Sequence, residues 1–302
     1  MLARQDEYSD LPKGIHRVWK LPDAGLGAVW NSIIIDPALK DQLLSQAVLN
    51  FTLRPRVSRS VVPLHGVIML VGEPGTGKTS LARGLAHRVA DLFPSSKFRL
   101  LEVEPHALTS AAMGKTQRAI SDLFSQSIAE AAAHGPTIVL LDEVETLAAD
   151  RSKMSMEANP VDIHRATDAV LVQLDALAES KPNLLFIATS NFPQAVDDAF
   201  TSRCDLVMTV PLPDAKGCAA ILEDCLTGLS NTYPAIRKLV ASGQFAKAAG
   251  ACVGLDGRTI RKMVVSAMTR EQKTALNPEL LTIGDIVAAA QDAKANRKGQ
   301  HK

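Results

Sequence analysis

The chain of 302 residues is 46% hydrophobic and 22% charged, as expected of a globular protein with a sizeable core, and its net charge is only +1. That charge excludes a strong general attraction to nucleic acid or to a membrane surface, and no apolar run reaches the roughly eighteen residues that span a bilayer. Residues 1–7 contain acids and no apolar segment, so we expect a cytoplasmic protein without a secretion signal. The four cysteines show no C-x-x-C spacing, which favours free thiols over a zinc site.

Residues 1–20 are polar and rich in turn formers, which predicts a flexible arm at the start of the chain. The next segment, 21–50, is amphipathic, and Asp36 followed by Pro37 is typical of the first turn of a helix. Apolar runs of strand length then alternate with helical patterns for most of the way, at 66–71, 98–103, 137–141, 183–189 and 206–210. This alternation predicts an α/β fold with a mostly parallel sheet covered by helices on both faces.

After Pro213 the strand patterns stop and helical spacing continues. Helices are predicted over 214–227, 233–241, 257–271 and 281–290. We therefore expect an α/β domain over 21–211, an all-helical domain over 212–291, and a basic, disordered tail over 292–302.

A phosphate-loop pattern, G-x-x-x-x-G-K-[ST], matches Gly72-Glu73-Pro74-Gly75-Thr76-Gly77-Lys78-Thr79. The loop follows the apolar run 66–71 and leads, from Ser80 onward, into a helical pattern. Its backbone N–H groups, that of Ser80 included, and the positive end of the helix dipole would surround a phosphate group. Lys78 would reach the β- and γ-phosphates, and the Thr79 hydroxyl would hold Mg²⁺. The motif predicts a nucleotide-binding site.

Two acids, Asp142 and Glu143, follow the apolar run 137–141 directly. At such a strand end in a phosphate-loop fold, the aspartate holds Mg²⁺ and the next glutamate can polarise the attacking water as a general base. The alternative is a buried strand capped by two solvated acids, which the phosphate loop earlier in the same predicted sheet disfavours. Asn191 ends a further apolar strand, and strand ends converge at the nucleotide crevice of such a sheet. It would orient the water or contact the γ-phosphate, or else serve only as a turn residue.

Three arginines are candidates for stabilising charge on the transferred phosphoryl group. Arg203 precedes the run 206–210 and would act from a neighbouring subunit, although a lone arginine is usually a surface charge. Arg258 and Arg261 lie one turn apart at the start of a predicted helix, and either would fold back over the γ-phosphate. The alternative, a solvated basic first turn, is disfavoured because positive charge opposes the helix dipole there.

Taken together, these features resemble the AAA+ ATPases, from about Leu21 to Val287. The chain is most similar to the pachytene-checkpoint, or thyroid-receptor-interactor, branch, which remodels HORMA-domain proteins. The more discriminating stretches are Leu21-Pro22-Asp23-Ala24 with 29–36, and Gly254-Leu255-Asp256-Gly257-Arg258-Thr259-Ile260-Arg261-Lys262.

The resemblance implies a parallel five-stranded sheet of order 5-1-4-3-2, a helical lid domain and a homohexameric ring. ATP and Mg²⁺ would bind between subunits, with the segment from Trp30 to Ile34 against the adenine. The resemblance also assigns the family's roles to residues named above. Lys78 and Thr79 correspond to Walker A, Asp142 and Glu143 to Walker B, Asn191 to sensor 1, and Arg258, with Arg261 beside it, to sensor 2. Arg203 corresponds to the arginine finger, at a shorter spacing than in general AAA+ patterns.

Two departures from the family pattern matter. Only about 20 residues precede Leu21, where eukaryotic members carry a substrate-binding domain, and this favours a compact bacterial relative of the kind found beside HORMA proteins in antiphage cyclic-nucleotide signalling operons. In the pore loop, the family's aromatic pair is replaced by Ala112 and Met113, followed by Gly114. Met113 would still grip an extended chain, more weakly than an aromatic ring, or would only pack at a helix start.

The leading hypothesis is therefore an ATP-driven remodeller of a HORMA-domain partner, with no membrane association. The alternative is a nucleic-acid-associated AAA+ loader that uses ATP as an assembly switch. The near-zero net charge and the lack of an interleaved basic–aromatic pattern argue against nucleic acid. An inactive AAA+ scaffold is disfavoured because the phosphate-loop residues and both acids are present.

Overall fold

The computed structural model describes residues 11–108, 115–150 and 160–300. The chain divides into two compact units. The first comprises Met1–Ile33, Pro37–Gly72 and Lys78–Thr209, and the second Ile34–Asp36, Glu73–Gly77 and Val210–Lys302. The second unit thus begins close to the predicted boundary at residue 211. The sequence did not indicate that two short segments, one of them the middle of the phosphate loop, would group with it.

A six-stranded sheet forms the centre of the first unit, in the order β1-β3-β4-β5-β2-β6. Its strands are β1 (Ile15–Lys20), β2 (Val67–Val71), β3 (Arg99–Val103), β4 (Thr137–Leu141), β5 (Leu184–Ser190) and β6 (Leu206–Thr209). The five strands from β2 to β6 are parallel. If these five parallel strands are numbered 1 to 5 in chain order, their order across the sheet is 5-1-4-3-2. The predicted strand order is confirmed.

Strand β1 is an addition to the predicted sheet, and it pairs antiparallel with β3 at the edge. The prediction of a flexible arm over residues 1–20 was therefore wrong for β1. Trp19 on this strand donates a hydrogen bond from Nε1 to Oε1 of Glu102, at 2.6 Å. Arg83 binds both oxygens of the same carboxylate, at 2.9 and 2.8 Å. Glu102 is only 4% exposed, so these partners compensate the desolvation of its charge and fasten β1 to the sheet.

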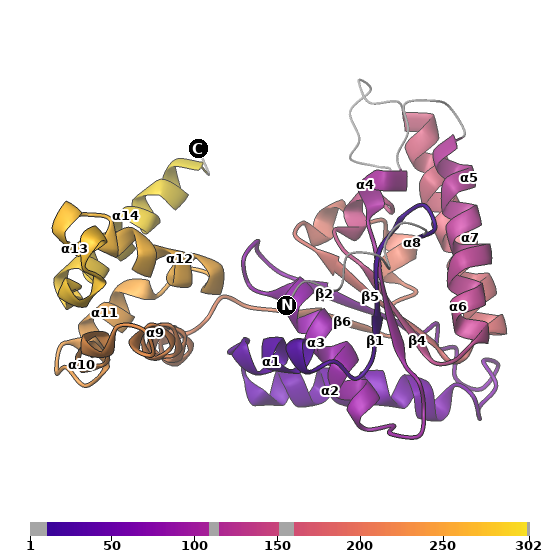
Figure 1. Ribbon diagram of the computed structural model, residues 1–302. Helices are drawn as coiled ribbons and strands as arrows, with labels where there is room; N and C mark the ends of the chain where they lie inside the picture. The colour runs from indigo at the N-terminus through magenta and orange to yellow at the C-terminus, as the bar shows by residue number, and fades with distance from the viewer. Residues whose placement is uncertain (1–10, 109–114, 151–159, 301–302) are drawn as a thin grey trace. The chain divides into compact units, whose positions relative to one another are not determined.

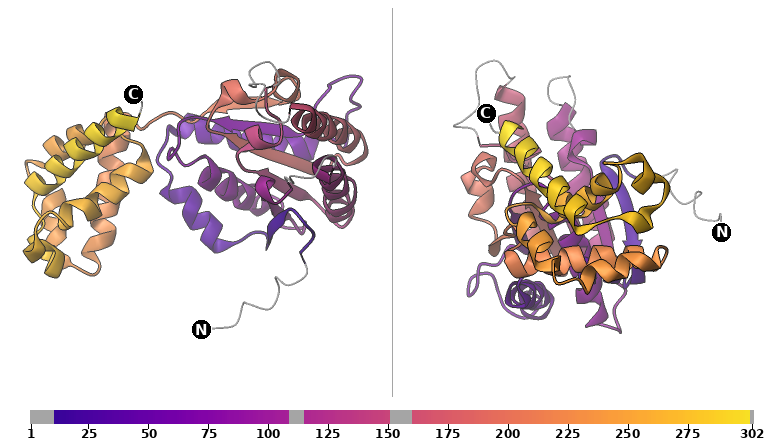
Figure 2. Two further views of the ribbon diagram at one scale, coloured as in Figure 1. Left: turned by 90° about the horizontal axis from the view of Figure 1, so that it is seen from above. Right: turned by 90° about the vertical axis from the view of Figure 1, so that its left-hand side faces the viewer.

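Helices cover both faces of the sheet, with α1–α3 on one face and α5–α7 on the other (Figures 1 and 2). The longer helices of this unit are α1 (Ala24–Ser32), α2 (Pro37–Leu53), α3 (Lys78–Asp91), α5 (Lys115–Asp122) and α7 (Pro160–Ser180). The shorter ones are α4 (Pro105–Leu108), η1 (Leu123–Ile128, a π-helix), α6 (Ala129–Ala133), η2 (Val144–Thr146), η4 (Pro193–Ala195) and α8 (Asp198–Thr201). Helix α2 begins at Pro37, as the sequence predicts.

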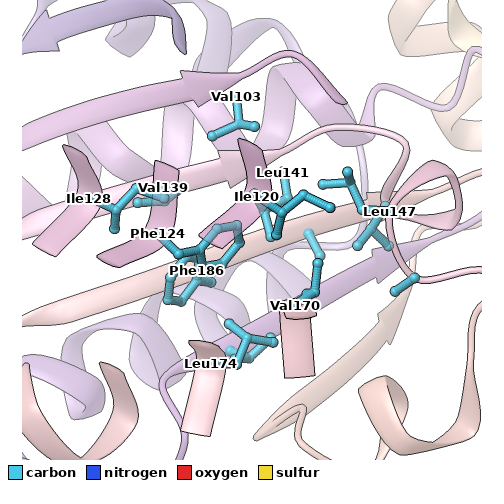
Figure 3. Close-up of a cluster of buried hydrophobic side chains, with 14 of the residues drawn as sticks. Val103, Ile120, Phe124, Ile128, Val139, Leu141, Leu147, Val170, Leu174 and Phe186 are labelled. Atoms are coloured by element: carbon cyan, nitrogen blue, oxygen red, sulfur yellow. The ribbon is translucent and has the colours of Figure 1, made fainter. Parts of the chain in front are cut away.

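The main core lies between the sheet and the helices α5, η1 and α7 (Figure 3). All residues of β2, β4 and β5 are buried, which explains why their sequences are continuous apolar runs rather than alternating ones. Phe124 on η1 stacks on Phe186 of β5, with 5.7 Å between ring centroids (Figure 3). On the other face, α1 packs on α3, where a Cβ at Gly84 would lie 2.6 Å from the Cβ of Trp30. Only glycine allows this close approach.

The second unit is helical apart from its two short segments, with its own hydrophobic cluster. Its elements are α9 (Ala215–Ser230), η5 (Pro234–Ile236), α10 (Arg237–Val240), α11 (Phe245–Cys252), α12 (Gly257–Met268), α13 (Gln272–Leu276), η6 (Pro278–Leu280) and α14 (Ile283–Gln300). Residues fully buried in the cluster include Leu222, Leu226, Ile260, Val264 and Ile286. Helix α14 extends to Gln300, so the predicted disordered tail over 292–302 was wrong for residues 292–300. No helix in the described part of the chain is long and apolar enough to cross a membrane.

Candidate active site

The phosphate loop leaves β2 at Gly72, whose N–H donates to the carbonyl of Ser190, at 3.3 Å. Gly75 and Gly77 have φ of +85° and +95°, a left-handed conformation that glycine adopts without strain. Helix α3 begins at Lys78, which is 5% exposed and donates from Nζ to the carbonyl of Gly72, at 2.8 Å. The loop thus ends at a helix N-terminus with a buried ammonium group beside it, which is the arrangement that binds phosphate.

The two residues predicted to hold Mg²⁺ lie side by side. Oδ1 of Asp142, just beyond β4, accepts a hydrogen bond from the Thr79 hydroxyl at 2.8 Å. Mg²⁺ takes hard oxygen ligands and is usually held by one or two protein groups together with substrate phosphates. A hydroxyl and a carboxylate oxygen next to a phosphate loop therefore fit this ion.

Glu143 and Asn191 are also brought together. Oε1 of Glu143 accepts a hydrogen bond from Nδ2 of Asn191, at 3.3 Å. Glu143 has φ of +52° and is the only non-glycine residue with a positive φ in the described ranges. Such strain is held in place by its surroundings and is concentrated at functional sites. Its carboxylate is half exposed, so that water can reach it.

Two residues near these acids were missed by the sequence reasoning. Thr189 donates from its hydroxyl to Oδ1 of Asp142, at 2.5 Å. His106 on α4 places Nε2 3.8 Å from Oε2 of Glu143. His106 also lines a cavity of about 240 Å³, together with Arg83, Glu102, Asp142 and Glu143, among others. Asn191 was found because residues at the carboxyl ends of parallel strands converge at one edge of the sheet. The same reasoning could have found Thr189, a polar residue near the end of β5, and His106, which lies just beyond β3.

Arg203 lies away from this cluster. Its Nε and Nη2 atoms bind both oxygens of Asp175 on α7, at 2.9 and 2.7 Å, and Nη1 donates to the carbonyl of Ala199. The hydrogen bonds between the two side chains lower the pKa of Asp175 and raise the pKa of Arg203. Two residues further on, Asp205 accepts hydrogen bonds from the N–H groups of His65, Gly66 and Val67, where β2 begins.

The phosphate loop follows the opposite end of β2, a strand of five residues that rises about 16 Å. Arg203 is therefore near one end of β2, and the loop of its own subunit is beyond the other end.

In the second unit, α12 is capped by Asp256, which accepts hydrogen bonds from the N–H and the hydroxyl of Thr259, at 2.9 and 2.6 Å. The N–H of Arg258 donates to the carbonyl of Gly75, at 3.3 Å. A Cβ at Gly75 would lie 2.1 Å from Oδ1 of Asp256, so no larger residue fits here. Arg261 forms an ion pair with Asp224 at 2.8 Å. The roles of Arg258 and Arg261 toward a phosphate remain predictions.

Three further predictions concern loop and segment residues. Glu73 of the phosphate loop is paired with Arg297 of α14, within the second unit. Trp30, expected near adenine, is buried against α3 with its carbonyl accepting a hydrogen bond from Lys40 at 2.8 Å. The expected pore loop, formed by Ala112, Met113 and Gly114, lies outside the described residues.

Residues 68–212 match the family model described as "ATPase family associated with various cellular activities (AAA)". Over 297 residues the chain is 68% identical to CD-NTase-associated protein 6 of Pseudomonas aeruginosa, covering 98% of each protein. The chain belongs to the AAA family of ATPases. This AAA ATPase is also 33% identical over 280 residues to a pachytene checkpoint protein 2 homolog of Oryza sativa subsp. indica, covering 81% of the chain but 59% of that longer protein.

Solved structures agree with this assignment. The structure of C. elegans PCH-2 matches with a TM-score of 0.74 and 25% identity, covering 97% of the chain and 78% of that protein. A chain in the E. coli MS115-1 HORMA:CdnC:Trip13 complex matches with a TM-score of 0.70 and 18% identity, covering 94% and 97%, and shares the fold. The AAA+ resemblance, the fold class and the ATPase activity predicted from the sequence are thereby confirmed.

Proposed function

We propose that this AAA ATPase is a homohexameric remodeller that engages and partly unfolds a HORMA-domain protein, disassembles its complexes and thereby regulates an antiphage signalling system. The observation that supports the proposal is the cluster in which Thr79 contacts Asp142 and Asn191 contacts Glu143, at the end of β4 and next to the phosphate loop. The choice of partner is supported by the CD-NTase-associated relative, which the chain matches over 98% of its length, and by the solved complex of HORMA, CdnC and Trip13 proteins.

In this proposal ATP is the substrate and Mg²⁺ the cofactor, held by the Thr79 hydroxyl and the Asp142 carboxylate. When bound, Mg²⁺ would neutralise charge on the phosphates. Glu143 takes the proton of the attacking water, and Asn191, which already contacts the Glu143 carboxylate, holds that water in place. Arg258 and Arg261 contribute positive charge from α12, with Met113 as the pore residue that grips the partner. A cytoplasmic location is part of the proposal, supported by the use of ATP and by four cysteines with free thiols.

A purified hexamer tests the choice between remodelling and nucleic-acid loading. ATP hydrolysis is measured alone, with a HORMA-domain protein from the same genome, and with short duplex DNA at the same concentration. We expect several-fold stimulation by the HORMA protein and none by DNA. Stimulation by DNA alone would favour the nucleic-acid loader instead.

The pore residue is tested separately. Met113→Ala should retain basal hydrolysis and lose disassembly of a HORMA complex, which size-exclusion chromatography detects.

The second proposal concerns Arg203, which we infer acts on the nucleotide of the neighbouring subunit. Its position near the opposite end of β2 from its own phosphate loop supports action in trans. Arg203→Ala is expected to lower kcat at least about 100-fold while leaving the Kd for ATP within about threefold, because an arginine finger stabilises charge of the transition state. Arg237→Ala, on the exposed face of α10, is the control and should retain wild-type kcat.

Mixed hexamers separate action in trans from a structural role. Arg203→Ala subunits retain an intact phosphate loop, and Lys78→Ala subunits retain Arg203. We expect the mixture to hydrolyse ATP faster than the sum of the two variants measured separately. If mixing adds nothing, Arg203 serves its own subunit, where its ion pair with Asp175 already gives it a structural role.

A further inference from the structure

Thr189 is buried in β5, with only 1% of the residue exposed. Its hydroxyl donates to Oδ1 of Asp142 at 2.5 Å and accepts the backbone N–H of Glu143 at 3.1 Å. The direction of both hydrogen bonds is settled by chemistry, because an ionised carboxylate only accepts and an amide N–H only donates. A single hydroxyl is therefore hydrogen-bonded both to the side chain of Asp142 and to the backbone of Glu143.

The sheet register explains how Thr189 comes to lie there. It pairs with Leu70 on β2, and the residue before it, Ala188, pairs with Leu141, the last residue of β4. Asp142 is thus the first residue past the end of β4, directly beside Thr189 on the neighbouring strand. At this point the chain turns out of the sheet, and Glu143 takes its left-handed conformation with φ of +52°.

The Thr79 hydroxyl donates to the same oxygen, Oδ1 of Asp142, at 2.8 Å. Two hydroxyls therefore hold this carboxylate from different elements, the start of α3 and the end of β5. Thr79 is also the proposed ligand of Mg²⁺, which its oxygen would hold through a lone pair while the proton is donated to Asp142. Thr189 has no proposed role in holding the ion, and its hydroxyl can donate to Oδ1 of Asp142 whether or not Mg²⁺ is bound.

We propose that Thr189 is a positioning residue that aligns the metal-holding carboxylate of Asp142 and, through the same hydroxyl, holds the backbone of Glu143 in the conformation from which its side chain acts. The inference rests on the proposed roles of those two acids. The competing explanation is that Thr189 is only a buried polar residue whose hydrogen bonds are satisfied. The two explanations differ in what happens when the hydroxyl alone is removed.

Thr189→Val removes the hydroxyl and keeps the branched shape that suits a buried strand. We expect kcat to fall about 10- to 100-fold, the range for a lost hydrogen bond to a charged group. We also expect the Mg²⁺ concentration that half-saturates binding of a fluorescent ATP analogue to rise at least about threefold, with little change in binding without Mg²⁺. This second readout needs no turnover. Thr189→Ser keeps the hydroxyl and should restore both values to within about threefold of the wild type.

Thr137→Val is the matched control. Thr137 is another fully buried threonine of the sheet, but its hydroxyl donates to the carbonyl of Gly135 at the far end of β4. It should change the melting temperature and leave kcat and the Mg²⁺ midpoint unchanged. The inference is overturned if Thr189→Val retains both wild-type values, if Thr137→Val shows the same losses, or if Thr189→Ser rescues neither.

If Thr189→Val does not fold, Thr189→Ala is used in its place, and a melting curve establishes that it is folded. The inference is then judged by the same changes in kcat and in the Mg²⁺ midpoint. The Glu143→Gln variant distinguishes a failure of this inference from a failure of the proposed roles of the two acids. Normal turnover in that variant would contradict the role of Glu143, whereas the Mg²⁺ midpoint of Thr189→Val reports on the alignment of Asp142 independently.

Discussion

Replacing Glu143 with Gln should leave ATP bound while lowering kcat at least about 100-fold, the effect of removing a general base. Glutamine keeps the size of the side chain and can still contact Asn191, but it cannot take a proton from water. The substitution should disturb the fold little, because the Glu143 side chain is half exposed and contacts Asn191 at 3.3 Å and His106 at 3.8 Å. Single-turnover hydrolysis and equilibrium binding of a fluorescent ATP analogue measure the two quantities separately.

The same variant should also hold its protein partner, because a ring that binds ATP without hydrolysing it cannot complete the cycle. A pull-down with Glu143→Gln is expected to retain the HORMA-domain protein in the presence of ATP and to lose it without ATP. Glu179→Gln, an exposed position near the end of α7, is the control for the change of charge. Wild-type turnover in Glu143→Gln would refute the assignment of the base, and loss of ATP binding would show that the carboxylate helps to hold the nucleotide.

Replacing Lys78 with Ala should raise the Kd for ATP at least about 100-fold, because each hydrogen bond to a charged phosphate contributes roughly 1.5–3 kcal/mol and one ammonium group makes more than one of them. Lys78 is 5% exposed at the start of α3, and its Nζ atom reaches back 2.8 Å to the carbonyl of Gly72. The ammonium group is therefore held over the loop before any phosphate arrives. Isothermal titration calorimetry measures the Kd, and sedimentation velocity should show a weaker hexamer.

Lys97→Ala provides the control, since Lys97 is an exposed lysine just before β3 in the same unit. It should bind ATP as the wild type does. A melting temperature close to that of the wild type establishes that Lys78→Ala is folded, which matters because a buried side chain is truncated. Binding of ATP within about threefold of the wild type would show that Lys78 does not contact the phosphates.

Much of the candidate nucleotide site was predictable because each of its parts is a short local pattern. The loop from Gly72 to Thr79 lies between a strand and a helix, and Asp142 and Asn191 each follow an apolar run. The carboxyl ends of parallel strands meet at one edge of a sheet, so the sequence also predicted that these residues would converge. The strand order, by contrast, came from the AAA+ resemblance, because local patterns do not state which strands are neighbours.

The errors occurred where a local pattern is weak. Strand β1 reads Ile-His-Arg-Val-Trp-Lys and lies within a polar, turn-rich segment, residues 1–20, whose composition predicts a flexible arm. An edge strand tolerates such residues because one side of it faces water. The tail was misjudged in the same way, since helix α14 continues through a basic segment in which Arg297 donates to the carbonyl of Gly254, at 2.6 Å.

Periodicity and motifs are read along the chain, so the sequence predicted the parallel strands, most of the helices, the phosphate loop and the two acids after β4. Three further points became visible with the folded chain: Glu102 fastens β1 through Trp19 and Arg83, Thr189 hydrogen-bonds to the Asp142 carboxylate and the Glu143 backbone, and Arg203 lies near the opposite end of β2 from the loop. Each depends on contacts between residues far apart in the sequence. Such contacts are set by strand register and packing, and no local pattern encodes them.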